Sequence, residues 1–260
     1  MKVLICCVIL IICLPLAAGT FLPLSSFEDA RITDFEFSLK WATLLNLGSC
    51  VYEEDLWYNC GINEAAFVAP QIQLQKALTE DMQMGLEAFT IGDLPNQAFY
   101  VKLNLKRLLE QNENAVFSLN PSAGYSRNRF SPWELRLKPY LDQKPGSQQD
   151  SQAFFAQLPL LVYLKKPGIN CCVKLGYSRF EAKARYLVTE HDAEPAMQDF
   201  SYGPHDLVNA GISVNLPIKI GWLRIRPELG YEVFSLVQHE DMFSGSVTGG
   251  LAFSFVWPQQ

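Results

Sequence analysis

The stretch FSGSVTGGLAFSFVW, residues 243–257, alternates between large apolar side chains and small or polar ones. Large apolar residues stand at odd-numbered positions, which we call the apolar parity: Phe243, Val247, Leu251, Phe253, Phe255 and Trp257. Because successive side chains of a β-strand point to opposite faces, the alternation predicts a strand with one apolar and one polar face. Strands of soluble proteins usually have about five to six residues, whereas strands of membrane barrels have roughly ten alternating residues. The length of this stretch therefore favours a strand that crosses a membrane.

The same period of two recurs along the chain. It is clearest in residues 35–41, 99–105, 133–141, 208–220 and 223–233. The remaining candidate strands are residues 66–76, 81–91, 113–126, 153–164 and 169–188. Tight turns at residues 165–168 and Gly221 and polar loops at residues 48–61 and 189–205 fit hairpins. The set has about eleven strands, and single-chain bacterial barrels usually have an even number. The sequence predicts an all-β fold, a closed antiparallel up-and-down transmembrane β-barrel of about 10–12 strands.

Composition supports an apolar surface. Apolar residues make up 49% of the 260 residues and charged residues only 18%, against about 25% charged in a typical soluble chain. Beyond the N-terminus no run reaches the roughly 18 apolar residues that a membrane helix needs. The apolar residues therefore fill a large core or face lipid at every second position. The formal net charge of −6 argues against nucleic acid as a partner, because nucleic-acid-binding proteins favour a basic face.

Residues 1–19 have the three parts of a secretory signal peptide. Lys2 supplies a short positive region, residues 3–16 form an apolar core, and small residues follow up to Gly19. We expect cleavage after Gly19, which leaves residues 20–260 as the mature barrel domain. An uncleaved anchor helix is the alternative, but the apolar run is short and small residues end it.

A soluble β-sandwich would produce the same alternation, with its polar parity facing water. Two features favour the membrane barrel. Aromatic residues stand near strand ends, as expected of girdles at the two membrane interfaces. These residues are Phe35, Trp41, Phe99, Trp133, Trp222, Phe243 and Trp257. The polar parity also carries Gly, Ser, Asn and charges of both signs, which suits a crowded, wet interior better than an exposed sheet surface.

The signal peptide, the alternating strands and the closing run LAFSFVW, residues 251–257, resemble Gram-negative outer-membrane β-barrel proteins of the porin-like class. The resemblance implies a location in the outer membrane, with outer-membrane lipid and the barrel-assembly machinery as partners. In that class the last strand usually ends on an aromatic residue that the machinery reads, which assigns the assembly signal to Phe253, Phe255 and Trp257. Three residues follow Trp257 here, so Phe255 is the alternative end.

The polar parity of the strands carries charges of both signs. Those expected to line the lumen are Lys102, Lys106, Glu134, Arg136, Lys138, Lys174, Lys219, Arg224, Arg226, Glu228 and Glu232. They either form a network of mutually paired charges that fills a small lumen, or they line a polar pore and set its selectivity. In both cases the charges need partners, because an unpaired charge in a narrow interior is costly.

Four of the seven cysteines lie beyond the signal peptide. Export implies an oxidising compartment, in which cysteines can pair. We favour a disulfide between Cys50 and Cys60, because the two flank a polar, acidic loop. Cys171 and Cys172 are adjacent in a predicted strand and would point to opposite faces, so no bond between them is expected. No Cys-x-x-Cys pair or nearby histidine supports a metal site.

These features predict a passive pore or small-solute channel with a charged lumen, which would pass small polar solutes. The alternative is a structural or adhesive barrel that acts through its external loops. A lipid-modifying barrel enzyme is a third hypothesis. However, His239 is followed by Glu240 and Asp241, so the His-x-Ser spacing of lipid-deacylating barrels is absent. We therefore expect no catalytic residues, no cofactor and no enzyme activity.

Overall fold

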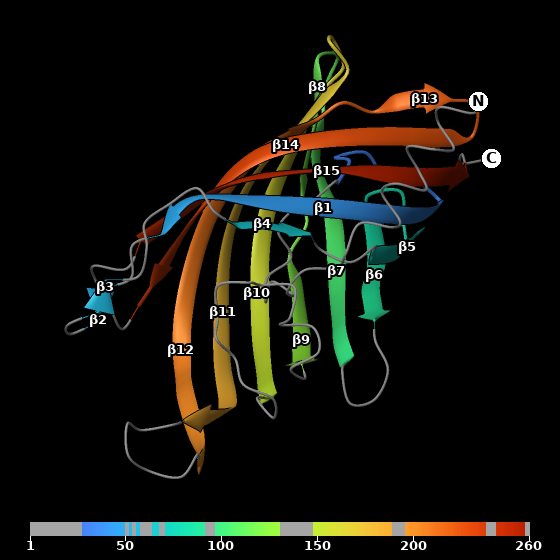
Figure 1. Cartoon of the computed structure of the whole chain (residues 1–260). Coiled ribbons are helices and arrows are strands. Elements are labelled where there is room, and N and C mark those ends of the chain that lie inside the picture. Colours follow the sequence, from blue (N-terminus) through green and yellow to red (C-terminus); the bar gives the residue numbers. More distant parts are fainter. Residues whose placement is uncertain are drawn as a thin grey trace, which may run out of the picture.

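The alternating stretches form antiparallel strands that join edge to edge into one closed barrel, which the computed structural model shows in Figure 1. The structure describes residues 28–49, 52–53, 56–57, 64–67, 71–91, 97–130, 148–188, 196–237 and 243–257. The regular secondary structure assigned in these ranges consists of β-strands. No helix within them is long and apolar enough to span a membrane.

The strands are β1 (Phe35–Ser49), β2 (Tyr52–Glu53), β3 (Leu56–Trp57), β4 (Glu64–Phe67), β5 (Gln71–Ala77), β6 (Met82–Ile91), β7 (Gln97–Gln111), β8 (Ala115–Leu119), β9 (Ser122–Phe130), β10 (Gln148–Leu164), β11 (Ile169–Val188), β12 (Ala196–Asn215), β13 (Ile218–Ile220), β14 (Leu223–Leu236) and β15 (Phe243–Trp257). The predicted bounds of β11 and β15 agree with the structure.

Closure of the barrel joins its first and last strands. β1 pairs with β15, and Phe35 stands opposite Trp257 at the end of this seam. β10 pairs with β11 along its whole length, which completes the circle. β8 and β9 share one position, because each pairs with β7 on one side and with β10 on the other. The barrel therefore has ten strands, and the predicted fold class is confirmed.

The strand predicted at residues 208–220 has different bounds in the structure. β12 begins at Ala196, within the expected polar loop at residues 189–205, and it ends at Asn215. The chain then turns, and residues 218–220 form the separate strand β13 rather than continuing β12.

The stretch at residues 113–126 is divided into β8 and β9 near Pro121, which has no N–H to donate to a ladder. The strand expected at residues 133–141 lies outside the described residues. β9, which precedes it in the sequence, pairs directly with β10, which follows it.

Burial alternates along the strands, but polar side chains are buried and apolar side chains are exposed, which is the reverse of the pattern in a soluble protein. The buried polar side chains include Glu36, Ser38, Lys40, Gln73, Gln75, Glu87, Asn104, Arg226, Glu232 and Ser254. The exposed apolar side chains include Ile72, Leu74, Leu103, Leu158, Val173, Leu175, Ile212 and Leu229. Soluble proteins rarely expose so large an apolar surface. A polar interior and an apolar exterior are the construction of a barrel whose outside meets lipid.

The two ends of the barrel differ in their connections. At one end lie the turns at residues 78–81, 112–114 and 165–168 and the link between β12 and β14. The first and last residues of the barrel, Phe35 and Trp257, meet at the same end. Outer-membrane barrels have short turns on the periplasmic side and longer loops outside the cell. We call this the short-turn end, and for an outer-membrane barrel the rule predicts that it faces the periplasm.

Toward the opposite end, the outward side chains change from apolar to polar. On β11 the exposed residues Val173, Leu175 and Tyr177 are followed by the exposed Arg179. The Tyr177 hydroxyl donates a 2.5 Å hydrogen bond to Asp206 of β12, and Arg179 lies 3.9 Å from the same carboxylate. The row of Tyr177, Arg179 and Asp206 marks the outer boundary of the exposed apolar surface, which we call the lipid-facing band.

An aromatic cluster stands at the same level of the barrel. The rings of Phe99 and Tyr125 are 5.5 Å apart, and those of Tyr125 and Phe154 are 4.8 Å apart. Phe154 is directly opposite Arg179 in the ladder. A membrane-crossing strand needs about 9–11 residues, and β11 and β12 have 20 residues each. Both strands therefore extend well beyond the membrane at this end.

Candidate functional site

Residues 28–34, with the sequence EDARITD, precede the first strand and lie inside the barrel at its short-turn end. This stretch, the lumen segment, has no alternation between apolar and polar residues. Glu28, Asp29 and Ala30 are each at most 2% exposed. The segment binds inward-facing side chains from strands on all sides of the barrel, which places it across the lumen.

Side chains of the strands satisfy the backbone of the lumen segment, because it has no ladder partner of its own. Four of these hydrogen bonds come from neutral side chains. Asn215 Nδ2 donates to the Glu28 carbonyl at 3.0 Å, and the Ala30 N–H donates to Asn170 Oδ1 at 3.2 Å. Gln83 Nε2 donates to the Thr33 carbonyl at 3.0 Å, and the Ser118 hydroxyl donates to the Ala30 carbonyl. The donors and acceptor come from β12, β11, β6 and β8, so they position the segment only when these strands are in place.

Glu28 is held by two amides and a lysine. Gln73 and Gln75 donate to its two carboxylate oxygens at 2.9 and 3.0 Å. The Lys40 ammonium is 3.6 Å from the same carboxylate. Burial alone would raise the pKa of Glu28, but Lys40 and Lys106 lower it to about 2. Glu28 is therefore ionised throughout the neutral range.

Asp29 joins the lumen segment to β14. Its carboxylate accepts bonds from Arg31 Nη2 at 2.6 Å and from Arg224 Nη1 at 2.8 Å. Burial opposes the charge of Asp29, but these two guanidinium groups hold its pKa well below the ordinary value. The Arg31 guanidinium also lies 3.9 Å from the ring centre of Tyr163 on β10, in a cation–π contact.

A second cluster lies next to Glu28. Glu87 of β6 is 2.7 Å from the Lys40 ammonium of β1 and 3.1 Å from the Lys102 ammonium of β7. All three groups are at most 4% exposed. One carboxylate thus neutralises two lysines from neighbouring parts of the wall, and the remaining charge is met by Glu28.

Arg226 forms the corresponding cluster on the β14–β15–β1 side. Its guanidinium pairs with Glu36 and donates to the hydroxyl of Ser254 at 2.5 Å. The hydroxyls of Ser254 and Ser38 are 2.8 Å apart. Further along the barrel, the Lys174 ammonium is 2.9 Å from Glu232, and Asn209 also donates to Glu232.

Most of the charges that the sequence analysis assigned to the lumen are buried inside the barrel. These are Lys102, Lys106, Lys174, Arg224, Arg226, Glu228 and Glu232. Glu134, Arg136 and Lys138 lie outside the described residues. Lys219 is exposed on β13, where it stands opposite the inward-facing Arg224 in the ladder with β14. Its assignment to the lumen lining stays a prediction.

The sequence analysis missed the lumen segment and the glutamines that bind it. Gln73 and Gln75 have the inward parity of β5, and their alternation with apolar residues was a usable signal. Glu28 and Asp29 gave no such signal, because a segment without a strand period has no predictable face.

The predicted disulfide between Cys50 and Cys60 lies outside the described residues. Cys171 and Cys172 are free thiols. The predicted assembly signal lies on β15, where Phe253, Phe255 and Trp257 have the outward parity. Its recognition by the assembly machinery stays a prediction.

The arrangement closes the lumen at this level. A water-filled channel leaves its lining accessible to water, but Glu36, Lys40, Glu87, Lys106 and Arg226 are each at most 1% exposed. Their charges are instead matched by one another and by the lumen segment. Such an interior stabilises and seals the barrel, because buried charges need partners.

No protein-family model matches the chain, and no curated protein matches it. Among solved structures, the outer membrane protease OmpT from Escherichia coli is similar at 11% identity and a TM-score of 0.45, over 89% of this chain and 100% of that chain. The translocator domain of the autotransporter NalP from Neisseria meningitidis is similar at 9% identity and a TM-score of 0.42, over 87% and 90%. The toluene transporter TodX from Pseudomonas putida is similar at 8% identity and a TM-score of 0.38, over 93% and 95%.

These likenesses concern the fold alone, so the class of the protein rests on the barrel itself. Its strands close without a free edge, its interior is polar and its lipid-facing band is apolar. That construction is the one of a transmembrane β-barrel.

Proposed function

We propose that this protein is a closed outer-membrane barrel that acts at the cell surface through the part of β9–β12 beyond the membrane. The observation that carries the proposal is the lumen segment, whose residues 28–34 lie across the barrel and bind its wall on all sides. The proposal includes membrane lipid and the assembly machinery as partners, and it includes no catalytic step.

The length of the strands supports action outside the membrane. Above the row of Phe154 and Tyr177, the described residues with the outward parity of β9–β11 are polar: Arg127, Gln152, Arg179 and Glu181. Tyr125 donates to Gln152 at 2.9 Å, and Gln152 donates to Glu181 of β11. These bonds join three strands beyond the lipid-facing band. A rigid, polar sheet in this position suits contact with a partner outside the cell.

A passive pore for small polar solutes, as expected from the sequence, requires an open lumen. The lumen segment would have to leave the barrel for such a pore to form. Its contacts are hydrogen bonds and ion pairs, so release is physically allowed. A gated channel is therefore the second candidate function. It differs from a closed barrel in its conductance.

Conductance in a planar lipid bilayer tests the proposal. We expect the wild-type protein to show no steady conductance, because the charged side chains beside the lumen segment are buried and paired. A variant with Glu28→Gln and Asp29→Asn should open intermittently, since it lacks both carboxylates that hold the segment. Steady ohmic conductance of the folded wild-type protein would overturn the closed barrel and favour the channel.

Surface labelling of intact cells tests the orientation. An epitope inserted in the connection between β11 and β12 should bind antibody on intact cells. The matched insertion, in the turn at residues 165–168, should bind antibody only after the outer membrane is permeabilised. The reverse result would place the long strands in the periplasm and contradict a role at the cell surface.

A further inference from the structure

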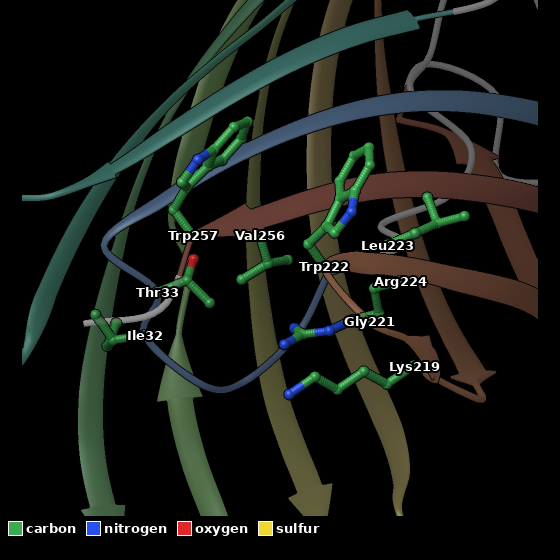
Figure 2. A pocket seen from close by; sticks show the side chains of 9 residues that line it. All are labelled: Ile32, Thr33, Lys219, Gly221, Trp222, Leu223, Arg224, Val256 and Trp257. Carbon is green, nitrogen blue, oxygen red and sulfur yellow. The ribbon is translucent and has the colours of Figure 1, made fainter. Parts of the chain in front are cut away.

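A pocket of about 400 Å³ opens at the short-turn end, between the lumen segment and the ends of β13, β14 and β15 (Figure 2). Its lining includes Thr33, Lys219, Trp222, Arg224, Val256 and Trp257. In Figure 2 the nitrogens of Lys219 and Arg224 extend to the same side, toward Ile32 and Thr33. The pocket thus combines two cations with two indole rings.

Neighbouring residues fix the aromatic part of the pocket. The Trp222 ring stacks on Phe255 with 4.9 Å between ring centres. The Trp257 ring packs edge-on against Phe35 at 5.3 Å. The Val256 N–H donates to the Trp222 carbonyl at 3.1 Å, which joins the β13–β14 turn to β15. The rings are therefore in place before any ligand binds.

The charge of the pocket is positive. Lys219 is exposed and has no ion-pair partner among the described residues. Arg224 pairs with Asp29 through Nη1 at 2.8 Å, so one carboxylate faces two cations. An anionic group in the pocket would complete the pairing and could accept hydrogen bonds from the Lys219 ammonium.

The position of the pocket identifies the source of the anion. Trp222 is 67% exposed and Trp257 is 52% exposed at the end of the lipid-facing surface. Exposed tryptophans of membrane proteins sit at the level of the lipid headgroups. The neighbouring Ile218 and Ile220 are also exposed and offer apolar contact to acyl chains. A basic pocket at this depth meets the phosphates of the periplasmic leaflet.

We propose that this pocket binds the phosphate group of a single phospholipid in the periplasmic leaflet, with its acyl chains along the outer face of β13. Lys219 and Arg224 hold the phosphate, and Trp222 and Trp257 hold the glycerol region. The site borders the lumen segment through Thr33 and Arg224, and the proposal depends on the orientation of the barrel.

Native mass spectrometry of the detergent-purified protein, titrated with phosphatidylglycerol, tests this site. We expect one lipid to bind more tightly than the rest. Lys219→Ala should weaken the binding of that lipid about fivefold, which corresponds to the ~1 kcal/mol that a basic residue contributes near anionic lipid. The matched control is Lys76→Ala, because Lys76 is an exposed lysine opposite Phe35 at the same end. This control should leave the tight lipid unchanged.

Two further measurements separate a lipid from a free anion and from misfolding. Trp222→Ala should also weaken the binding of the lipid, while excess inorganic phosphate should not displace the lipid. Displacement by inorganic phosphate alone would overturn the lipid assignment. Equal effects of Lys219→Ala and Lys76→Ala would overturn the site. Each variant should keep the heat-dependent gel mobility of the folded barrel, which shows that weaker binding does not reflect unfolding.

Discussion

Glu28 and Asp29 are carboxylates that burial disfavours and that surrounding cations keep ionised. Glu28 is compensated by groups on β1 and β5, and Asp29 by Arg224 of β14 and by Arg31 of the lumen segment, so both charges depend on the barrel around them. Removing one partner of such a buried pair typically costs about 3–5 kcal/mol, because the other charge stays unpaired. At the residue scale, the lumen segment is therefore held by electrostatic interactions that depend on protonation.

Acid should release the lumen segment. The pKa of Glu28 falls from its ordinary value of 4.5 to about 2 in the folded protein. A lowered carboxyl pKa stabilises the folded state above the ordinary value, and the stabilisation is lost as pH falls toward the folded value. The heat-unfolding midpoint in detergent micelles should therefore decrease between about pH 4.5 and 2. Glu28→Gln should lower the midpoint at pH 7 and flatten this decrease. Identical pH profiles for the two proteins would contradict the role of Glu28.

At the element scale, the sequence predicted strands well where one face meets lipid. β15 alternates between large apolar and small or polar residues along its length, so its bounds could be read directly. The outer half of β12 was missed because no hydrocarbon faces it, and a polar strand resembles a loop in sequence. The inward face of each strand was predictable, whereas the lumen segment has no period from which a face could be inferred.

Leu175 tests the lipid-facing band. It lies on β11 within the band and is 60% exposed. Leu175→Arg should destabilise the barrel in lipid vesicles more than a substitution at the interface, because the cost of a charge rises toward the bilayer midplane, where it reaches roughly 2–4 kcal/mol. Leu164→Arg is the matched control, since Leu164 is exposed at the short-turn end of β10. It should cost only about 0–1 kcal/mol near the interface. Urea unfolding in vesicles measures both, and equal costs would contradict the assigned depth of the band.

For the whole molecule, the charge of the wall differs from the charge of the filled barrel. Among the described strand residues, the buried cations are Lys40, Lys102, Lys106, Lys174, Arg224 and Arg226. The buried strand carboxylates are Glu36, Glu87, Glu228 and Glu232. The strands thus present six cations and four anions, and the lumen segment adds the buried carboxylates of Glu28 and Asp29. The segment is an internal counter-ion for the wall.

A barrel opened by deleting residues 28–34 should therefore prefer anions. The excess of wall cations lowers the electrostatic barrier for chloride relative to potassium. The reversal potential of the deletion variant across a potassium chloride gradient measures this preference. A preference for potassium would show that the buried strand charges do not dominate the open lumen.

The lumen segment also has a consequence for the order of folding. It precedes β1 in the chain, but the groups that bind it come from β5, β6, β8, β11, β12 and β14. Such non-local contacts form late, after the intervening chain has been ordered. β1 itself is complete only when β15, which follows it by about 200 residues in the chain, pairs with it. Residues 28–34 are therefore among the last to reach their place, and their burial distinguishes a finished barrel from one that is still open along its seam.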